Sequence, residues 1–392
     1  MKILYIHNDY GRPSGEEQAA GEIVQLLRDH GHEVKWFRRT SEGYRDSLWG
    51  NIIAFFTGIY NPKTSWELAR VLDEYKPDVV QVQNLYPFIS TSVFRPLKKR
   101  NIPVVMRCPN YRLFCPQGLC LDPKGEVCER CWNGTYEWNC VSCNCLNSRL
   151  KSLAYAVRNW YARTSRNIFD GVDVFITQSE FQKRKFEGMG IDTNRIGILP
   201  GIPPIVSDIE EKEMGDWVTF VGRVSPEKGI YEFINAARLN PNIPFKVAGN
   251  LDEQFHIPAD CPSNVEFVGF KKGAELNQLY TDSRIIVIPS KWYEGFPNVI
   301  LRGMLLKRPV ITTSIGAMQS IIDTGVNGIL VTPGNAKELG EAVRLLYYDR
   351  KKCIMYGKNG YEKATTVYSK EVIYHTLMGI YDNAIKRAKH HA

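Results

Sequence analysis

Residues 285–310 read IIVIPSKWYEGFPNVILRGMLLKRPV, and this stretch decides the fold. The run 285–289 is apolar and β-branched, long enough for one buried strand. Residues 290–297 are turn-rich and carry Glu294, and from Asn298 the apolar residues recur at helical spacing. A loop between a parallel strand and a helix N-terminus commonly binds anions in open α/β sheets. A plain loop with one surface carboxylate fits the same spacing.

On both sides of this stretch, short apolar strands alternate with amphipathic helices. In the first third we predict strands over 3–6, 34–37, 79–83 and 103–106, and helices over 16–30 and 65–75. In the second half we predict strands over 217–221, 245–248, 265–268, 310–312 and 329–331, and helices over 231–238, 275–280 and 336–347. This rhythm and the length of 392 residues predict an α/β chain of two Rossmann-like, doubly wound domains facing a cleft.

Composition sets the broad class of the protein. The apolar share of 44% and the charged share of 23% are ordinary for a soluble globular chain. A net charge of +8 favours anionic partners such as nucleotide diphosphates, anionic lipid or nucleic acid. The sequence starts directly as a strand, without the features of a signal peptide, and has no run of about 18 apolar residues. We therefore expect a cytoplasmic protein, with peripheral contact at the inner face of the membrane as an option.

Eight of the ten cysteines fall between positions 108 and 145, in a loop-rich insertion over 108–148. A small insertion with little core of its own needs a covalent or metal staple. Thiolates at Cys-x-x-Cys spacing suit tetrahedral zinc, and an iron–sulfur cluster, disulfides and free thiols are the alternatives. Four sulfurs would close the coordination shell, so we predict a structural zinc ion.

The next segment, 149–166, reads RLKSLAYAVRNWYARTSR and has five basic residues and no acid. One interpretation is a helix that rests on an anionic membrane or faces a phosphorylated acceptor. The other is a solvated basic helix packed against the insertion. Nucleic-acid binding would use the same residue types, but no base-reading module is present, so we expect no nucleic-acid partner.

Two cations follow the strand 217–221. Arg223 leaves the strand end after Gly222, and Lys228 stands five residues on, before a helix. At the mouth of a parallel sheet such cations suit a diphosphate, which Arg binds bidentately and Lys as a point charge. Solvated loop cations are the plainer interpretation. The Pro-Ser-Gly turn before helix 16–30 is a second candidate anion site, or a simple helix start.

The motif EGFPNVIL at 294–301 resembles the donor-site signature of family 4 glycosyltransferases, retaining enzymes of the GT-B fold. The Arg223/Lys228 pair, the Ser-Gly-Glu-Glu helix start and the cysteine insertion extend the resemblance over nearly the whole chain. The segment 200–215 is rich in Pro, Gly and acids, so we expect it to link domains over 1–200 and 201–368. The resemblance implies that a terminal helix over 369–392 crosses back to the first domain. It also implies transfer of a sugar from a nucleotide-diphosphate donor to a glycan or lipid-linked acceptor, without a catalytic divalent metal.

The resemblance also implies roles for individual residues. Glu294 would hold the donor sugar and stabilise charge near the anomeric carbon, while Arg223 and Lys228 would neutralise the departing diphosphate. The other implied donor contacts are Gly15, Glu16, Gly222, Gly295, Phe296, Asn298 and Arg302. The implied metal ligands are Cys115, Cys128, Cys131 and Cys145, with Cys140 and Cys143 as substitutes.

Three positions depart from the family pattern. Arg302 stands where the family has a second Glu that grips the nucleotide ribose. Ser320 replaces a carboxylate near the donor, and Pro109 replaces a first-domain histidine. His7 is the one histidine in a plausible first-domain site loop, where a structural role is the commoner one. These departures support a second hypothesis, a catalytically impaired relative that binds or regulates.

Overall fold

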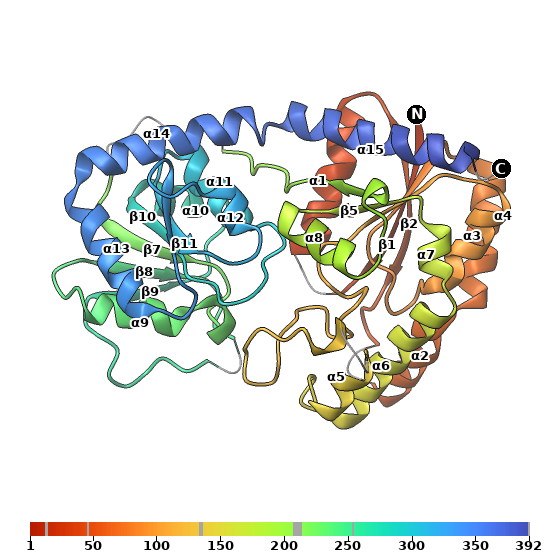
Figure 1. Ribbon diagram of the computed structural model, residues 1–392, viewed down its shortest axis with the longest axis horizontal. Helices are drawn as coiled ribbons and strands as arrows, with labels where there is room; N and C mark the ends of the chain where they lie inside the picture. The colour runs from red at the N-terminus through yellow and green to blue at the C-terminus, as the bar shows by residue number, and fades with distance from the viewer. Residues whose placement is uncertain (12–14, 45–46, 133–135, 207–213, 253–254, 391–392) are drawn as a thin grey trace. The chain divides into compact units, whose positions relative to one another are not determined.

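The computed structural model describes residues 1–11, 15–44, 47–132, 136–206, 214–252 and 255–390. The chain divides into two compact units. Unit 1 comprises Met1–Pro123, Cys128–Ile202 and Ile373–Ala392, and unit 2 comprises Lys124–Val127 and Pro203–Val372. Each unit is built around a parallel sheet with helices packed against it (Figure 1). The prediction of two Rossmann-like domains is therefore confirmed.

Unit 1 contains a six-stranded parallel sheet in the order β2-β1-β3-β4-β5-β6. Its strands are β1 (Lys2–Asp9), β2 (Glu33–Thr40), β3 (Val79–Val82), β4 (Val104–Arg107), β5 (Val174–Thr177) and β6 (Ile196–Ile198). The strand order reverses between β1 and β3. Polar residues at the carboxyl ends of these strands therefore lie where open α/β sheets bind ligands.

The helices of unit 1 begin with α1, whose apolar face packs on β1. The α-helices are α1 (Gly15–Asp29), α2 (Leu48–Ile59), α3 (Pro62–Tyr75), α4 (Phe94–Lys99), α5 (Trp138–Ser142), α6 (Arg149–Thr164), α7 (Asn167–Gly171) and α8 (Glu180–Gly188). Short 3-10 turns are η1 (Thr91–Val93), η2 (Arg130–Trp132) and η3 (Thr193–Arg195). The C-terminal helix α15 (Lys370–His390) joins this core through Leu377 and Tyr381, and the Tyr381 hydroxyl donates to the side-chain oxygen of Gln81 on β3.

Unit 2 contains a second six-stranded parallel sheet, in the order β12-β11-β10-β7-β8-β9. Its strands are β7 (Trp217–Val221), β8 (Phe245–Ala248), β9 (Val265–Gly269), β10 (Ser283–Ile288), β11 (Val310–Thr313) and β12 (Gly328–Val331). Its helices are η4 (Pro226–Lys228), α9 (Ile230–Arg238), α10 (Gly273–Thr281), α11 (Asn298–Leu305), α12 (Met318–Ile321), α13 (Ala336–Tyr348) and α14 (Arg350–Thr366). Here the order reverses between β7 and β10, which makes their carboxyl ends the topological switch point.

Most predicted elements are present with ends displaced by a few residues, and several elements were not predicted. Among the latter are α2, α14 and the β5-α8-β6 segment of unit 1. The predicted linker over 200–215 falls partly on residues 207–213, which lie outside the described residues. Within the described ranges, no helix has the length and hydropathy needed to cross a bilayer.

Candidate active site

The predicted donor residues of unit 2 follow the two strands that flank its switch point. Arg223 and Lys228 come after β7, and Glu294 comes after β10. β7 and β10 are hydrogen-bonded neighbours, with Phe220 opposite Val287. Residues separated by about 70 positions in sequence therefore emerge side by side at one edge of the sheet.

A glycine fixes how closely these two loops approach. Gly229 ends η4 with a left-handed backbone, φ +78°, and a Cβ at this position would lie 1.9 Å from the carbonyl oxygen of Pro289. The amide of Lys291 also donates to the carbonyl of Glu227 at 2.9 Å. Only glycine fits this contact without strain, so residue 229 sets the position of Lys228 beside the loop that carries Glu294.

Glu294 is buried and held by three donors. Its Oε1 accepts from Lys228 Nζ at 2.6 Å, from Ser290 Oγ at 2.6 Å and from Trp292 Nε1 at 2.9 Å. Burial alone would raise the pKa of this carboxyl, but the Lys228 ammonium and the other two donors outweigh it and hold the pKa below its ordinary value. The site thus presents a fixed carboxylate next to a fixed cation.

Arg223 has other partners in this structure. Its guanidinium pairs with Glu227 and lies 3.4 Å from Asp252 Oδ2, and the side chain is half exposed. It therefore lies at the same sheet edge as Lys228 but is not joined to Glu294. Gly222, the preceding residue, follows β7 directly.

The N-terminus of α11 begins at Asn298, after Gly295 and Phe296. The Oδ1 atom of Asn298 is buried and accepts no hydrogen bond from any described residue. Phe296 packs edge-on against Tyr368, with ring centroids 5.4 Å apart. The start of α11 therefore carries a buried hydrogen-bond acceptor that has no described partner.

Arg302 lies one turn further along α11. Its Nη1 donates to Oδ1 of Asn277 on α10. The Arg302 side chain thus hydrogen-bonds to a neighbouring helix, a contact that was not predicted. An arginine offers donors only, so it cannot accept hydrogen bonds from ribose hydroxyls as a glutamate would.

Ser320 bonds within its own turn. Its hydroxyl donates to the carbonyl of Ala317 at 2.7 Å. Just before it, Gly316 has φ +61°, and a Cβ there would lie 3.2 Å from the backbone of Glu294. The loop after β11 therefore packs over Glu294 through Gly316, while Ser320 supplies no charge.

In unit 1, Gly15 and Glu16 form the start of α1. The Glu16 carboxylate accepts from the Tyr10 hydroxyl at 2.7 Å, and its backbone carbonyl accepts from Gln83 at 2.9 Å. Burial is the main cause that raises the pKa of Glu16, and it exceeds the opposing effect of Arg112. The first turn of α1 is thus held by polar contacts at the switch point of the first sheet.

A cavity of about 30 Å³ lies beside Glu16, at the carboxyl ends of β3 and β4. Among its lining residues are Arg107 and Arg112. Arg107 is only 2% exposed, and its Nε and Nη1 atoms donate to no described residue. Arg112 donates to Tyr10 at 3.1 Å and to Asn84 at 3.3 Å. Guanidinium groups that line a small cavity are suited to an oxyanion or ordered water.

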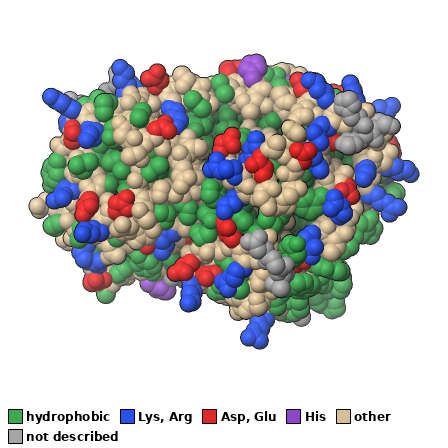
Figure 2. Space-filling view, in the orientation of Figure 1, with side chains coloured by type: hydrophobic (Ala, Val, Ile, Leu, Met, Phe, Trp, Pro, Cys, Tyr) green, Lys and Arg blue, Asp and Glu red, His purple; other side chains and the backbone are tan. Residues whose placement is uncertain are grey.

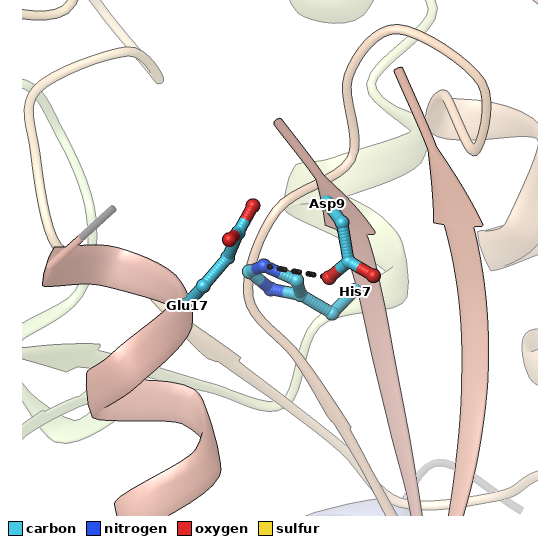
Figure 3. A group of neighbouring side chains, drawn as sticks. All are labelled: His7, Asp9 and Glu17. Atoms are coloured by element: carbon cyan, nitrogen blue, oxygen red, sulfur yellow. Dashed lines mark ion pairs between the residues drawn. The ribbon is translucent and has the colours of Figure 1, made fainter. Parts of the chain in front are cut away.

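His7, Asp9 and Glu17 converge near the end of β1 and the start of α1 (Figure 3). Their candidate ligand atoms lie within 4.8 Å of one another, and His7 Nε2 is 3.6 Å from Asp9 Oδ1. Burial, with the charges of Arg38 and Arg107, lowers the pKa of His7 to about 4. The charges of Arg38 and Arg107 also oppose a bound metal ion. His7 is therefore better described as a buried neutral histidine than as part of a metal centre.

The cysteine insertion gathers thiols without closing a metal shell. The Cys120 thiol and nearby backbone amides lower the pKa of Cys115 to about 6, and the Cys140 thiol lowers the pKa of Cys145. Thiolates of this kind suit a metal. Across the part of the chain that the structure describes, however, no three cysteine sulfurs lie within 4.8 Å of one another. In a tetrahedral zinc site with bonds of about 2.3 Å, all four sulfurs would be closer than that.

Lys228 and Glu294 were predicted as site residues, and the structure brings their side chains together. No role was predicted for Ser290, Trp292 or Gly229, which position them. A strand-end Arg107 was also missed, although a charged residue directly after a buried strand run was a usable signal.

Comparison with known proteins gives two adjoining family matches. Residues 14–201 match the glycosyl transferase 4-like domain, and residues 203–363 match the glycosyl transferases group 1 domain. The two matches meet where the structure passes from unit 1 to unit 2.

Individual relatives agree with these matches. The chain is 26% identical over 181 residues to the capsular polysaccharide biosynthesis glycosyltransferase CapM of Staphylococcus aureus, covering 44% of this chain and 47% of that protein. It is 24% identical over 237 residues to the N,N'-diacetylbacillosaminyl-diphospho-undecaprenol alpha-1,3-N-acetylgalactosaminyltransferase of Campylobacter jejuni, covering 54% and 61%. The chain thus spans about half to three fifths of the length of these relatives.

Among solved structures, the fold is similar to that of Anabaena HepE in complex with UDP. The TM-score is 0.62 at 18% identity, over 97% of this chain and 99% of that one.

Proposed function

Because the chain belongs to the glycosyltransferases that join a 4-like domain to a group 1 domain in a GT-B fold, we propose that it is a retaining glycosyltransferase. It transfers a sugar from a nucleotide-diphosphate donor to a hydroxyl of a glycan or lipid-linked acceptor. One relative is named for capsular polysaccharide biosynthesis, and another is named as a transferase that acts on a diphospho-undecaprenol-linked sugar. Both support this acceptor class.

The observation that carries the proposal is the Lys228–Glu294 pair at the switch point of unit 2. The Lys228 ammonium stabilises the negative charge that develops on the departing diphosphate, and Arg223 adds to this effect when it exchanges Glu227 for phosphate. Glu294 accepts from the donor sugar and stabilises positive charge at the anomeric carbon. The acceptor hydroxyl attacks from the face that the diphosphate leaves, so the anomeric configuration is retained.

Neighbouring groups complete the proposed donor site. The amides of Gly295 and Phe296, at the N-terminus of α11, donate to phosphate. The unpartnered Asn298 Oδ1 accepts from a donor hydroxyl. For unit 1, the family resemblance supports a role in donor binding for the start of α1, with Gly15 toward the diphosphate and Glu16 as the residue that opens the helix. Cations take the role of a divalent metal in this mechanism, so catalysis needs no added metal.

The test is a transfer assay with a panel of nucleotide sugars and of glycan and lipid-linked acceptors, followed by NMR of the product anomer. We expect transfer from one donor class with retained configuration, and its loss in Glu294→Gln. An inverted product would reject the retaining mechanism. Absence of both transfer and donor hydrolysis across the panel would reject the enzyme.

A catalytically impaired binding or regulatory protein is the second candidate. The donor-only side chain of Arg302 and the uncharged Ser320 favour it, because both positions lack a carboxylate. Calorimetry with UDP, GDP and ADP measures nucleotide binding. Binding would distinguish both the active enzyme and an impaired relative from a scaffold that binds no nucleotide. Binding that depends on Lys228 without turnover would favour the impaired relative.

We also propose that zinc is held in the insertion by Cys115, Cys128, Cys131 and Cys145. Their chemistry suits the ion, but the sulfur spacing does not yet fit a closed shell, so binding must draw the thiols together. A cytoplasmic location, with peripheral contact to an anionic membrane through residues 149–166, completes the proposal.

A further inference from the structure

Helix α2 turns its apolar face outward. Trp49, Ile52, Ile53 and Phe56 recur at the spacing of one helical face, and all four are exposed, Trp49 by 74% and Phe56 by 64%. The helix contains no charged residue. Single exposed apolar side chains are ordinary, but a continuous stripe of large ones marks an interaction surface.

Helix α6 places a second apolar stripe beside the first. Leu150, Leu153 and Trp160 are exposed on it, Leu150 by 77%. The two helices pack together, with the rings of Tyr60 and Tyr161 edge to face at 6.3 Å. Figure 2 shows hydrophobic surface gathered at the lower right, where Figure 1 places α2 and α6. The stripes therefore form one face of unit 1, here called the α2–α6 face.

Basic residues accompany the apolar ones on this face. Arg149 and Lys151 are exposed on either side of Leu150, and α6 has no acidic residue. An apolar stripe with tryptophan, bordered by Arg and Lys, is the composition of helices that lie in the interface of an anionic bilayer. A protein partner with a complementary apolar core would not require exposed cations on both sides of Leu150.

We propose that the α2–α6 face docks on an anionic lipid bilayer. The stripe of α2 lies parallel to the membrane plane and buries Trp49 and Phe56 at the boundary between headgroups and acyl chains. Arg149 and Lys151 contact the lipid phosphates. The twelve residues of α2 are too few to span the membrane, so the contact is peripheral and reversible.

This inference deepens the proposed function, on which it rests for its purpose: a docked enzyme meets a lipid-linked acceptor in the plane of the membrane. The contact itself needs neither donor nor acceptor. Its test can therefore fail while glycosyl transfer to a soluble acceptor stands, and the reverse also holds.

The experiment is flotation of the full chain with vesicles of phosphatidylcholine alone or with phosphatidylglycerol added, without nucleotide. We expect binding to the anionic vesicles, and about tenfold weaker binding for Phe56→Ser because one aromatic side chain no longer leaves water. The double variant Arg149→Gln with Lys151→Gln should also lose about tenfold, on anionic vesicles only. Phe270→Ser, which removes a similarly exposed ring (61%) from unit 2, is the matched control and should bind as the parent does.

Three results would overturn the proposal: no binding to anionic vesicles, equal loss in the Phe270→Ser control, or unchanged binding in both α2–α6 variants. Light scattering without lipid supplies a fourth. If the protein is a dimer that Phe56→Ser converts to monomers, the face belongs to a second copy of the chain. Circular dichroism of each variant verifies that α2 and the fold are retained.

Discussion

Lys228 and Glu294 form an ion pair of 2.6 Å between loops that start from adjacent strands, 66 positions apart in sequence. Two further donors, Ser290 Oγ and Trp292 Nε1, fix the Glu294 carboxylate. The centroid of the Trp292 ring lies 5.1 Å from the Lys228 ammonium. The pair is pre-organised before any donor binds. Charges held in place in this way stabilise a transition state without reorganising during the reaction.

Lys228→Ala should lower kcat for sugar transfer by about 10²-fold or more, because a fixed cation at the leaving group is lost. Initial rates at saturating donor measure the effect. Lys291→Ala is the control, since its ammonium pairs with Glu232 at 3.2 Å and not with Glu294. Near-parental turnover in Lys228→Ala would show that another group balances the diphosphate.

Gly229→Ala should disrupt donor binding and destabilise the fold by about 1–3 kcal/mol, because the added Cβ would lie 1.9 Å from the Pro289 carbonyl oxygen. Gly269→Ala is a matched control: residue 269 has φ +70° but no atom within 4 Å of the added Cβ. Urea unfolding and nucleotide calorimetry measure the two variants. A loss in Gly269→Ala as large as in Gly229→Ala would mean that backbone strain alone explains the effect.

The sequence predicted that Glu294 lies in a loop and that Arg223 follows a strand end. It did not predict which cation pairs with the Glu294 carboxylate. Spacing placed Arg223 and Lys228 together as a diphosphate pair. In the structure Lys228 turns to Glu294, while Arg223 bonds Glu227 and Asp252. That difference follows from the adjacency of β7 and β10 and from the close contact of Gly229, and neither is visible in one chain's spacing.

Helix α2 shows a different limit. Its sequence, LWGNIIAFFTGI, is almost uniformly apolar, so hydrophobic periodicity cannot separate a helix from a buried strand. Gly50 and Gly58 further lower its helix propensity. The helix is set by its N-cap, where Ser47 accepts from the Gly50 amide, and by packing against α6. The outward direction of its stripe depends on that tertiary packing.

Arg302→Glu should tighten nucleotide binding, because a carboxylate at this turn of α11 can accept from ribose hydroxyls where a guanidinium cannot. Calorimetry with UDP is the measurement, and a gain of about tenfold is the size expected for hydrogen bonds to a charged group. Arg302→Gln keeps a donor for Asn277 but adds no charge, so it should gain less. If Arg302→Glu gains nothing over Arg302→Gln, residue 302 does not face the ribose.

Zinc binding in the insertion predicts one metal ion per chain and a lower Tm after chelation, because the ion replaces a missing core. Elemental analysis and thermal unfolding measure both. Cys115→Ser and Cys145→Ser should abolish the bound metal, since both thiols have lowered pKa values and are ready ligands. Cys108→Ser should not, because burial raises the pKa of Cys108 to about 12 and its thiol bonds the Met106 carbonyl. Parent protein purified without metal, and unaffected by added zinc, would exclude the site.

His7 should make the protein less stable in acid. Burial and the charges of Arg38 and Arg107 lower its pKa to about 4 in the folded chain, against about 6.5 when unfolded. Below pH 6.5 the unfolded chain takes up the proton first, so the free energy of unfolding falls as the pH drops from 6.5 to 4. The loss attributable to His7 is at most about 3 kcal/mol, at roughly 1.4 kcal/mol for each pH unit.

Urea midpoints between pH 4 and 7, for the parent and for His7→Gln, measure this contribution. The glutamine cannot be protonated, so the difference between the two proteins isolates residue 7 from the acid titration of Asp9 and Glu16. His7→Gln should therefore lose less stability than the parent over that range. Parallel curves would mean that His7 keeps an ordinary pKa, and a bound cation at His7, Asp9 and Glu17 would instead appear as stabilisation by added metal in the parent alone.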